Sequence, residues 1–117
     1  MKEKRKSTRA PAKDHFIVVD RESDTVIGRV LNMTEEGMMV VSKVSVETES
    51  RFHCRMALPE KIAGQNQVVF DVECKWCRKD DMSGMFEAGF QLHNVSEKDA
   101  HVIGLLLQSW TTVKSRT

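Results

Sequence analysis

The sequence predicts a mainly β fold: a six-stranded antiparallel β-barrel followed by a C-terminal α-helix. Two observations carry this prediction. Apolar and polar residues alternate along several segments between residues 15 and 93, which is typical of half-buried strands. Over about residues 96–112 the apolar spacing changes to that of a helix. Consecutive strands joined by short turns favour antiparallel pairing, and a barrel with a helix over one opening would bury these apolar faces.

Six segments are rich in residues that favour strands. They span residues 15–19, 26–31, 38–41, 51–58, 68–76 and 86–93. The fifth is the clearest, because apolar side chains from Val68 to Trp76 face one side and charged ones face the other. Trp76 is therefore expected in the core, as is Cys74. Residues 59–66 are expected to form a loop, and Gly37 is expected to adopt a positive φ in the turn after the second strand.

The predicted helix has a recognisable start. Ser96 is a good N-cap residue, and an acidic residue three positions later, Asp99, makes the pattern close to a capping box. Apolar residues then follow at helical spacing: Ala100, Ile103, Leu106, Leu107 and Trp110. This face is predicted to pack on the barrel.

Charge is distributed unevenly along the chain. The 117 residues have a net charge of +1, but residues 1–13 carry +5, which leaves −4 on the remainder. This first segment has too little apolar surface to fold alone, so it is predicted to be a flexible basic arm. Residues 14–117 are predicted to form a single domain. A basic arm on a mildly acidic body indicates a local anion site or a solvated tail rather than a general nucleic-acid-binding surface.

Composition and spacing argue against several classes of protein. No apolar run approaches the roughly 20 residues of a membrane span, and the charged N-terminus has no apolar signal region, so a cytoplasmic protein is expected. Three cysteines and seven methionines fit a reducing compartment. Cys74 and Cys77 are three positions apart on a strand, so their thiols are expected on opposite faces and no metal site is predicted. No nucleophile with a base and an orienting acid is identifiable, so no enzyme is expected.

Two short motifs bear on function. The first is an Arg-x-x-x-Arg run, formed by Arg5 and Arg9 in the basic arm. The second is the polar turn between the second and third strands, which contains Asn32, Thr34 and Gly37. A guanidinium group can donate two hydrogen bonds to guanine, stack on a base or pair with phosphate. The two motifs together suit a ligand that carries guanines and phosphates.

In this order and strand context, the motifs resemble those of the PilZ domain family. The family pattern is Arg-x-x-x-Arg near the N-terminus and Asp/Asn-x-Ser-x-x-Gly after the second strand. The resemblance covers nearly the whole chain, since the family also has a six-stranded barrel and a C-terminal helix. The chain departs from the pattern at Thr34, which keeps the hydroxyl group of serine and adds a methyl group.

The resemblance implies that the protein binds cyclic di-GMP, a bacterial second messenger, and that it has no other cofactor. By the family pattern, Arg5 and Arg9 would contact guanine and phosphate. Asn32 would offer its carbonyl oxygen to a guanine amino group. Thr34 would supply a hydroxyl group, and Gly37 would let the backbone turn tightly.

The residue before the arginine motif and the arm itself carry two more expectations. The resemblance implies that the residue just before the first arginine influences whether one ligand or a stacked pair is bound. A basic residue there, Lys4, is expected to favour the pair, because a pair brings more phosphate charge. The arm would become ordered over the ligand and change the surface shown to a protein partner.

Two other functions stay open at this point. A PilZ-like module that no longer binds the ligand could act through protein contacts, and Thr34 is the only feature of the sequence that supports it. A small β-barrel could also bind RNA or DNA through the basic arm, although scarce aromatic residues and an acidic body argue against it. Titration with the cyclic dinucleotide separates these functions, and a steep salt dependence without nucleotide preference would indicate the last.

Overall fold

The structure, a computed structural model, describes residues 10–111. These residues form seven strands and one helix, which confirms the mainly β fold and the C-terminal helix. The elements are β1 (Ala10–Pro11), β2 (Ile17–Asp20), β3 (Val26–Met33), β4 (Gly37–Ser42), β5 (Arg51–Ile62), β6 (Gln65–Lys79), β7 (Phe86–His93) and α1 (Glu97–Thr111).

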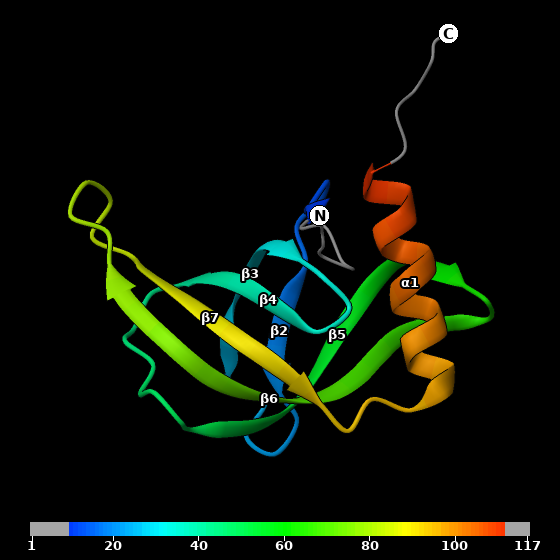
Figure 1. The fold of residues 1–117 in the computed structure, drawn as a ribbon, viewed down its shortest axis with the longest axis horizontal. Coiled ribbons are helices and arrows are strands. Elements are labelled where there is room, and N and C mark those ends of the chain that lie inside the picture. Colours follow the sequence, from blue (N-terminus) through cyan, green and yellow to red (C-terminus); the bar gives the residue numbers. More distant parts are fainter. Residues whose placement is uncertain (1–9, 112–117) are drawn as a thin grey trace, which may run out of the picture.

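Strands β2 to β7 form a closed barrel in which every pairing is antiparallel. The order around the barrel is β3-β2-β5-β6-β7-β4, and β4 returns to pair with β3. The short strand β1 is an addition that pairs with β3. Figure 1 shows α1 beside the hairpin formed by β5 and β6, and it contacts β6, β1 and β5. The predicted six-stranded barrel is confirmed, with one extra strand.

The helix begins where the sequence indicates and buries nearly the predicted face. The Oγ of Ser96 accepts a hydrogen bond from the backbone N–H of Asp99 at 3.0 Å, so Ser96 is the N-cap. Ala100 is exposed, in contrast to the prediction. The buried apolar residues of α1 are Val102, Ile103, Leu106, Leu107 and Trp110. The indole of Trp110 packs edge-on against Phe16 with 5.0 Å between ring centroids, which fixes the helix on the barrel.

Residues 59–66 are not the loop that was predicted. Strand β5 continues to Ile62 and pairs there with Gln65, the first residue of β6. Only Ala63 and Gly64 lie between the two strands, and both have positive φ, as two-residue hairpin turns require. The register shifts between Ala57 and Ile62, a stretch that contains Pro59, which has no N–H to donate. Polar composition suggested a loop, but the hairpin needs only two turn residues.

A β-bulge in β6 overturns the prediction for Trp76. Cys74 pairs with Phe90 and Trp76 pairs with Gly89, so one residue of β6, Lys75, is extra to the ladder. The bulge moves Trp76 from the inner face to the outer face of the barrel, where it is half-buried. Cys74, before the bulge, is fully buried as predicted.

The same bulge places both thiols on one side, against the prediction of opposite faces. The Sγ of Cys77 accepts a hydrogen bond from the N–H of Val46 at 3.4 Å, while the Sγ of Cys74 lies 4.0 Å from the carbonyl oxygen of Val46. Within residues 10–111, no group of three or more His, Cys, Asp or Glu side chains is arranged to hold a metal ion. The two thiols therefore tie the segment after β4 to the barrel.

Candidate ligand-binding site

The turn between β3 and β4 is held by the side chain of Thr34. Its Oγ1 accepts hydrogen bonds from the backbone N–H groups of Glu36 and Gly37, each at 3.1 Å. Its own N–H donates to the carbonyl oxygen of Gly37 at 2.8 Å. The Oγ1 atom itself lies 3.4 Å from that carbonyl oxygen, a long distance for an O–H donor. The threonine hydroxyl therefore shapes the turn and keeps donor capacity for another acceptor.

Gly37 is required for a different reason from the one predicted. Its φ is not positive; of the six glycines, all within residues 10–111, Gly64 and Gly84 are the two with positive φ. A Cβ at position 37 would lie 2.6 Å from the carbonyl oxygen of Phe90 on β7. On the other side of the turn, the N–H of Leu92 donates to the carbonyl oxygen of Glu36 at 2.8 Å. Glycine is thus needed for the close approach of the turn to β7.

Replacement of Gly37 by alanine should destabilise the fold by about 1–3 kcal/mol, because the added methyl group meets backbone that cannot rotate away. Urea denaturation of the purified variant measures this loss. Gly104→Ala is the matched control. Its Cβ would lie 3.6 Å from Oε2 of Glu35, an ordinary contact, and alanine favours the helix, so that variant should be as stable as the parent or more so. Equal stability of Gly37→Ala and the parent would contradict the close-approach argument.

Asn32 lies on the outer face of β3, next to this turn. It is half-buried, and its Nδ2 lies 3.6 Å from Sδ of Met39 on β4. Asn32 pairs with Met39 in the ladder. Asn32, Thr34 and Gly37 therefore lie close together at one end of β3 and β4, although only Thr34 is in the turn itself.

Strand β1 brings the end of the basic arm to the same rim. Ala10 pairs with Met33 and Pro11 pairs with Asn32, and Ala10 is fully buried. The N–H of Ala12 donates to the carbonyl oxygen of Leu31 at 3.0 Å. Residues 10–13, assigned to the arm from composition, thus belong to or adjoin the barrel edge. The remaining predicted site residues of the arm lie outside the described residues: Lys4, Arg5 and Arg9.

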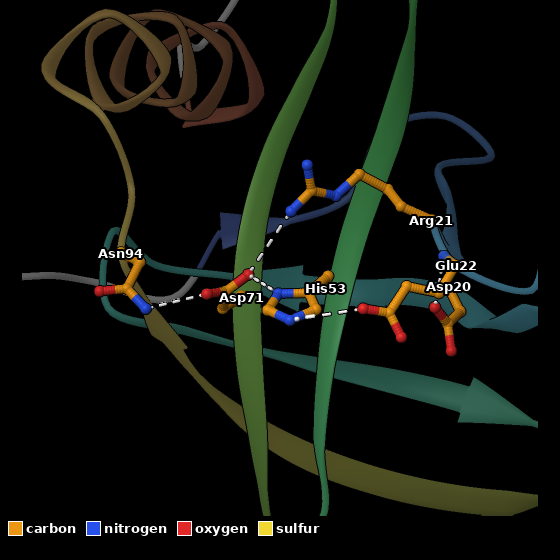
Figure 2. Close-up of polar contacts among 6 residues, drawn as sticks. All are labelled: Asp20, Arg21, Glu22, His53, Asp71 and Asn94. Carbon is orange, nitrogen blue, oxygen red and sulfur yellow. Dashed lines mark hydrogen bonds and ion pairs between the residues drawn. The ribbon is translucent and has the colours of Figure 1, made fainter.

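A second polar cluster, which sequence reasoning missed, lies on the outer face of β5 and β6 (Figure 2). The Nδ1 of His53 lies 2.6 Å from Oδ1 of Asp71, its partner in the ladder. Arg21 is 3.6 Å from the same oxygen, and the Nδ2 of Asn94 donates to Oδ2 at 2.8 Å. Glu22 lies 3.6 Å from the Nε2 of His53. The alternation of apolar and polar residues predicts that Asp71 lies on the outer face. That Asp71 meets His53 there depends on the register of β5 and β6.

The charges in this cluster shift its pKa values in opposite directions. The hydrogen bond to Asp71, and then the charge of that carboxylate, raise the pKa of His53 above its ordinary 6.5. The hydrogen bond from Asn94, followed by the contact with His53, lowers the pKa of Asp71. The neighbouring thiol of Cys54 faces the core, and burial raises its pKa to about 12, so it is no nucleophile for this pair.

Removal of the Asp71 charge should lower the pKa of His53. In an Asp71→Asn variant, an NMR titration of the His53 ring should move toward 6.5, whereas Glu22→Gln should move it less, because Asp71 is the larger cause. Since the folded-state pKa of His53 is raised and that of Asp71 is lowered, the pairing stabilises the fold fully between the ordinary pKa of an aspartate, about 4, and a pH of about 6.5. This contribution is lost as the pH rises through the folded-state pKa of His53 or falls through that of Asp71. An unchanged pKa in Asp71→Asn would contradict the pairing.

No helix in the described part of the chain is both long and apolar enough to cross a lipid bilayer.

Comparison with known proteins gives one family and several related folds. A sequence model of the PilZ domain matches residues 3–109. No curated protein matches the chain. Among solved structures, the PilZ domain of YcgR from Escherichia coli with c-di-GMP is similar, at 15% identity over 92% of both chains and a TM-score of 0.67.

Two longer proteins contain a similar domain. The Bacillus subtilis inhibitor of motility (MotI/DgrA) has 17% identity and a TM-score of 0.68, over 92% of this chain and 49% of that one. The K. pneumonia MrkH–c-di-GMP complex has 11% identity and a TM-score of 0.68, over 92% of this chain and 52% of that one. The chain thus spans about half the length of these two proteins. At such identities the likeness to solved structures concerns the fold.

Proposed function

The chain belongs to the PilZ domain family, and from this we propose that it is a receptor for cyclic di-GMP. Two proteins that share its fold, YcgR and MrkH, have structures with c-di-GMP bound. Both motifs that the family uses for this ligand are present in the chain, with Thr34 in place of serine.

One observation carries the proposal: the pairing of β1 with β3. Ala10 pairs with Met33, which lies between Asn32 and Thr34 in the chain. Ala10 directly follows Arg9, the last residue of the Arg-x-x-x-Arg motif, in the sequence. The residue that follows the Arg-x-x-x-Arg motif therefore lies beside the polar turn, although the two are separated by more than twenty residues in the sequence.

The residues have complementary roles in this proposal. Arg5 and Arg9 supply planar guanidinium groups that suit guanine edges and phosphates. Asn32 offers an amide to a guanine edge. Thr34 offers the donor capacity of its hydroxyl to a ligand acceptor, and its two accepted hydrogen bonds keep the turn in shape. Gly37 keeps the turn close to β7.

The signal would pass from the arm to the helix. β1 contacts α1 as well as β3, so an arm that becomes ordered on the ligand can act on the position or exposure of α1. We propose that a protein partner reads this change and that the receptor works in the cytoplasm without catalysis. Lys4, next to the arginine motif, would favour a stacked pair of ligands, because two ligands carry more phosphate charge.

Isothermal titration calorimetry with cyclic di-GMP tests the proposal, with GTP as the control nucleotide. Saturable binding that is specific to the cyclic dinucleotide is the expected result, and a stoichiometry of two ligands per chain would support the role of Lys4. A flat trace from a folded sample would reject the receptor and favour a ligand-free interaction module. A stoichiometry of one would reject only the stacked pair.

A further inference from the structure

Arg29 on β3 differs from the other arginines of residues 10–111, because it has no carboxylate partner among the described residues. Each of the other four lies 2.9 to 3.6 Å from a carboxylate oxygen. These ion pairs are Arg21–Asp71, Arg51–Glu73, Arg55–Asp24 and Arg78–Glu87. Arg29 is half-buried, so part of this side chain is removed from water without a counter-charge being supplied.

The neighbours of Arg29 in the sheet are apolar. Arg29 pairs in the ladder with Ile17 on β2 and with Val41 on β4. The next residue in this row is Glu87 on β7, two strand separations or about 10 Å from Arg29. The Oε1 of Glu87 accepts hydrogen bonds from Arg78. The row that contains Arg29 therefore supplies no free carboxylate to it.

Arg29 lies on the same outer face of β3 as Asn32. The next residue, Val30, is fully buried, and side chains alternate along a strand, so Arg29 points away from the core. Its partner Val41 is two residues from Met39, the partner of Asn32, which separates the two rows by roughly 7 Å. The guanidinium of Arg29 and the amide of Asn32 can thus reach one ligand from neighbouring rows of the barrel.

A cation in this position suits an anionic ligand better than it suits the barrel. Between Ile17 and Val41, an apolar β-branched side chain would fit the strand at a lower cost than a charged one. A ligand phosphate would supply the missing counter-charge. The planar fork of a guanidinium group matches the oxygens of a phosphate and stays charged at any physiological pH.

We propose that Arg29 binds a phosphate group of cyclic di-GMP. The inference rests on the proposed function and adds a third guanidinium to it, one that comes from the barrel rather than from the arm. Cyclic di-GMP carries two phosphate groups, and Asn32 would hold a guanine edge one row away. Because Arg29 belongs to β3, its position does not depend on the arm. It gives the ligand a contact on the barrel before the arm becomes ordered.

Calorimetry on Arg29→Met tests the contact, because methionine keeps an unbranched stem and removes the charge. Binding of cyclic di-GMP should weaken by roughly 10- to 150-fold, the effect of losing one charged hydrogen-bond donor. Arg29→Lys keeps the charge but loses the fork, so its affinity should lie between those of Arg29→Met and the parent. Arg55→Met is the matched control, since Arg55 is also half-buried on an outer strand face and should be dispensable for binding.

Two further measurements separate this role from a structural one. In urea denaturation, Arg29→Met should be at least as stable as the parent, because an unpaired charge is replaced by an apolar side chain between apolar neighbours. In the parent, the NMR signal of the Nε–Hε group of Arg29, identified by its loss in Arg29→Met, should shift as cyclic di-GMP saturates the protein. This second readout does not depend on the stability of a variant.

Failure of the inference and failure of the proposed function give different results. If the parent binds cyclic di-GMP but Arg29→Met binds equally well, or the Arg29 signal does not move, Arg29 is no ligand residue and the receptor function stands. An equal loss of affinity in Arg55→Met would reveal a general effect of positive charge and would also overturn the inference. If the folded parent does not bind at all, both the receptor function and the role of Arg29 are overturned.

Discussion

Replacement of Arg5 or Arg9 by alanine should weaken cyclic di-GMP binding by at least about 100-fold and leave the fold intact. Each guanidinium can make a bidentate contact, and a hydrogen bond to a charged group is worth about 1.5–3 kcal/mol. Two such bonds lost correspond to more than a hundredfold in the dissociation constant. The melting temperature should not change, because the arm is predicted to lie outside the core. Calorimetry and thermal denaturation of the same samples measure both quantities.

The controls separate charge from geometry. Arg51→Ala removes one positive charge from an exposed position on β5, where 68% of the side chain is accessible, and should bind as the parent does. Arg5→Lys and Arg9→Lys keep the charge but lose the planar fork, so they should also bind weakly. Parental affinity in both alanine variants would place the ligand elsewhere. Unfolding in either would show that these arginines are part of the folded body.

Side-chain periodicity was sufficient to predict the barrel and its helix. The alternation in residues 86–93 matches the bounds of β7, and the Ser96 signal lies at the observed N-cap. These features are local, so a single chain reveals them. The bulge in β6 is different, because Cys74, Lys75 and Trp76 fit an unbroken alternation. Gly89, opposite the bulge, was the one available sign, since glycine within a strand often marks a bulge or a close approach.

The candidate site was predictable where it depends on the spacing of neighbouring residues, and not where it depends on register. Thr34 lies in the turn that the motif indicates, whereas Asn32 belongs to β3 and Gly37 begins β4. The sequence shows a glycine at position 37 but not why glycine is needed there. A positive φ and a close contact with Phe90 would both require it, and the contact depends on which strand packs against the turn. The two-residue strand β1 is too short to produce a periodic pattern. The pairing of His53 with Asp71 also depends on the register of two strands.

Trp110, rather than Trp76, should be the tryptophan on which stability depends. Trp110 is 5% exposed and packs on Phe16, whereas Trp76 is half-buried on the outer face. Trp110→Ala removes a large buried ring and should destabilise the fold by about 3–5 kcal/mol. Trp76→Ala removes a ring that water already reaches in part, and should cost about 1 kcal/mol. Urea denaturation followed by circular dichroism measures both values without relying on tryptophan fluorescence.

A double-mutant cycle identifies the contact responsible. If the edge-on pair holds α1 on the barrel, Trp110→Ala and Phe16→Ala should be non-additive, with a coupling of about 0.5–1.5 kcal/mol beyond the area that each buries. Where the double variant is too unstable to purify, Trp110→Leu and Phe16→Leu give the same cycle with smaller cavities. Additive losses would mean that each ring stabilises the core independently. A larger loss of stability for Trp76→Ala than for Trp110→Ala would mean that Trp76 lies in the core, which would contradict the bulge.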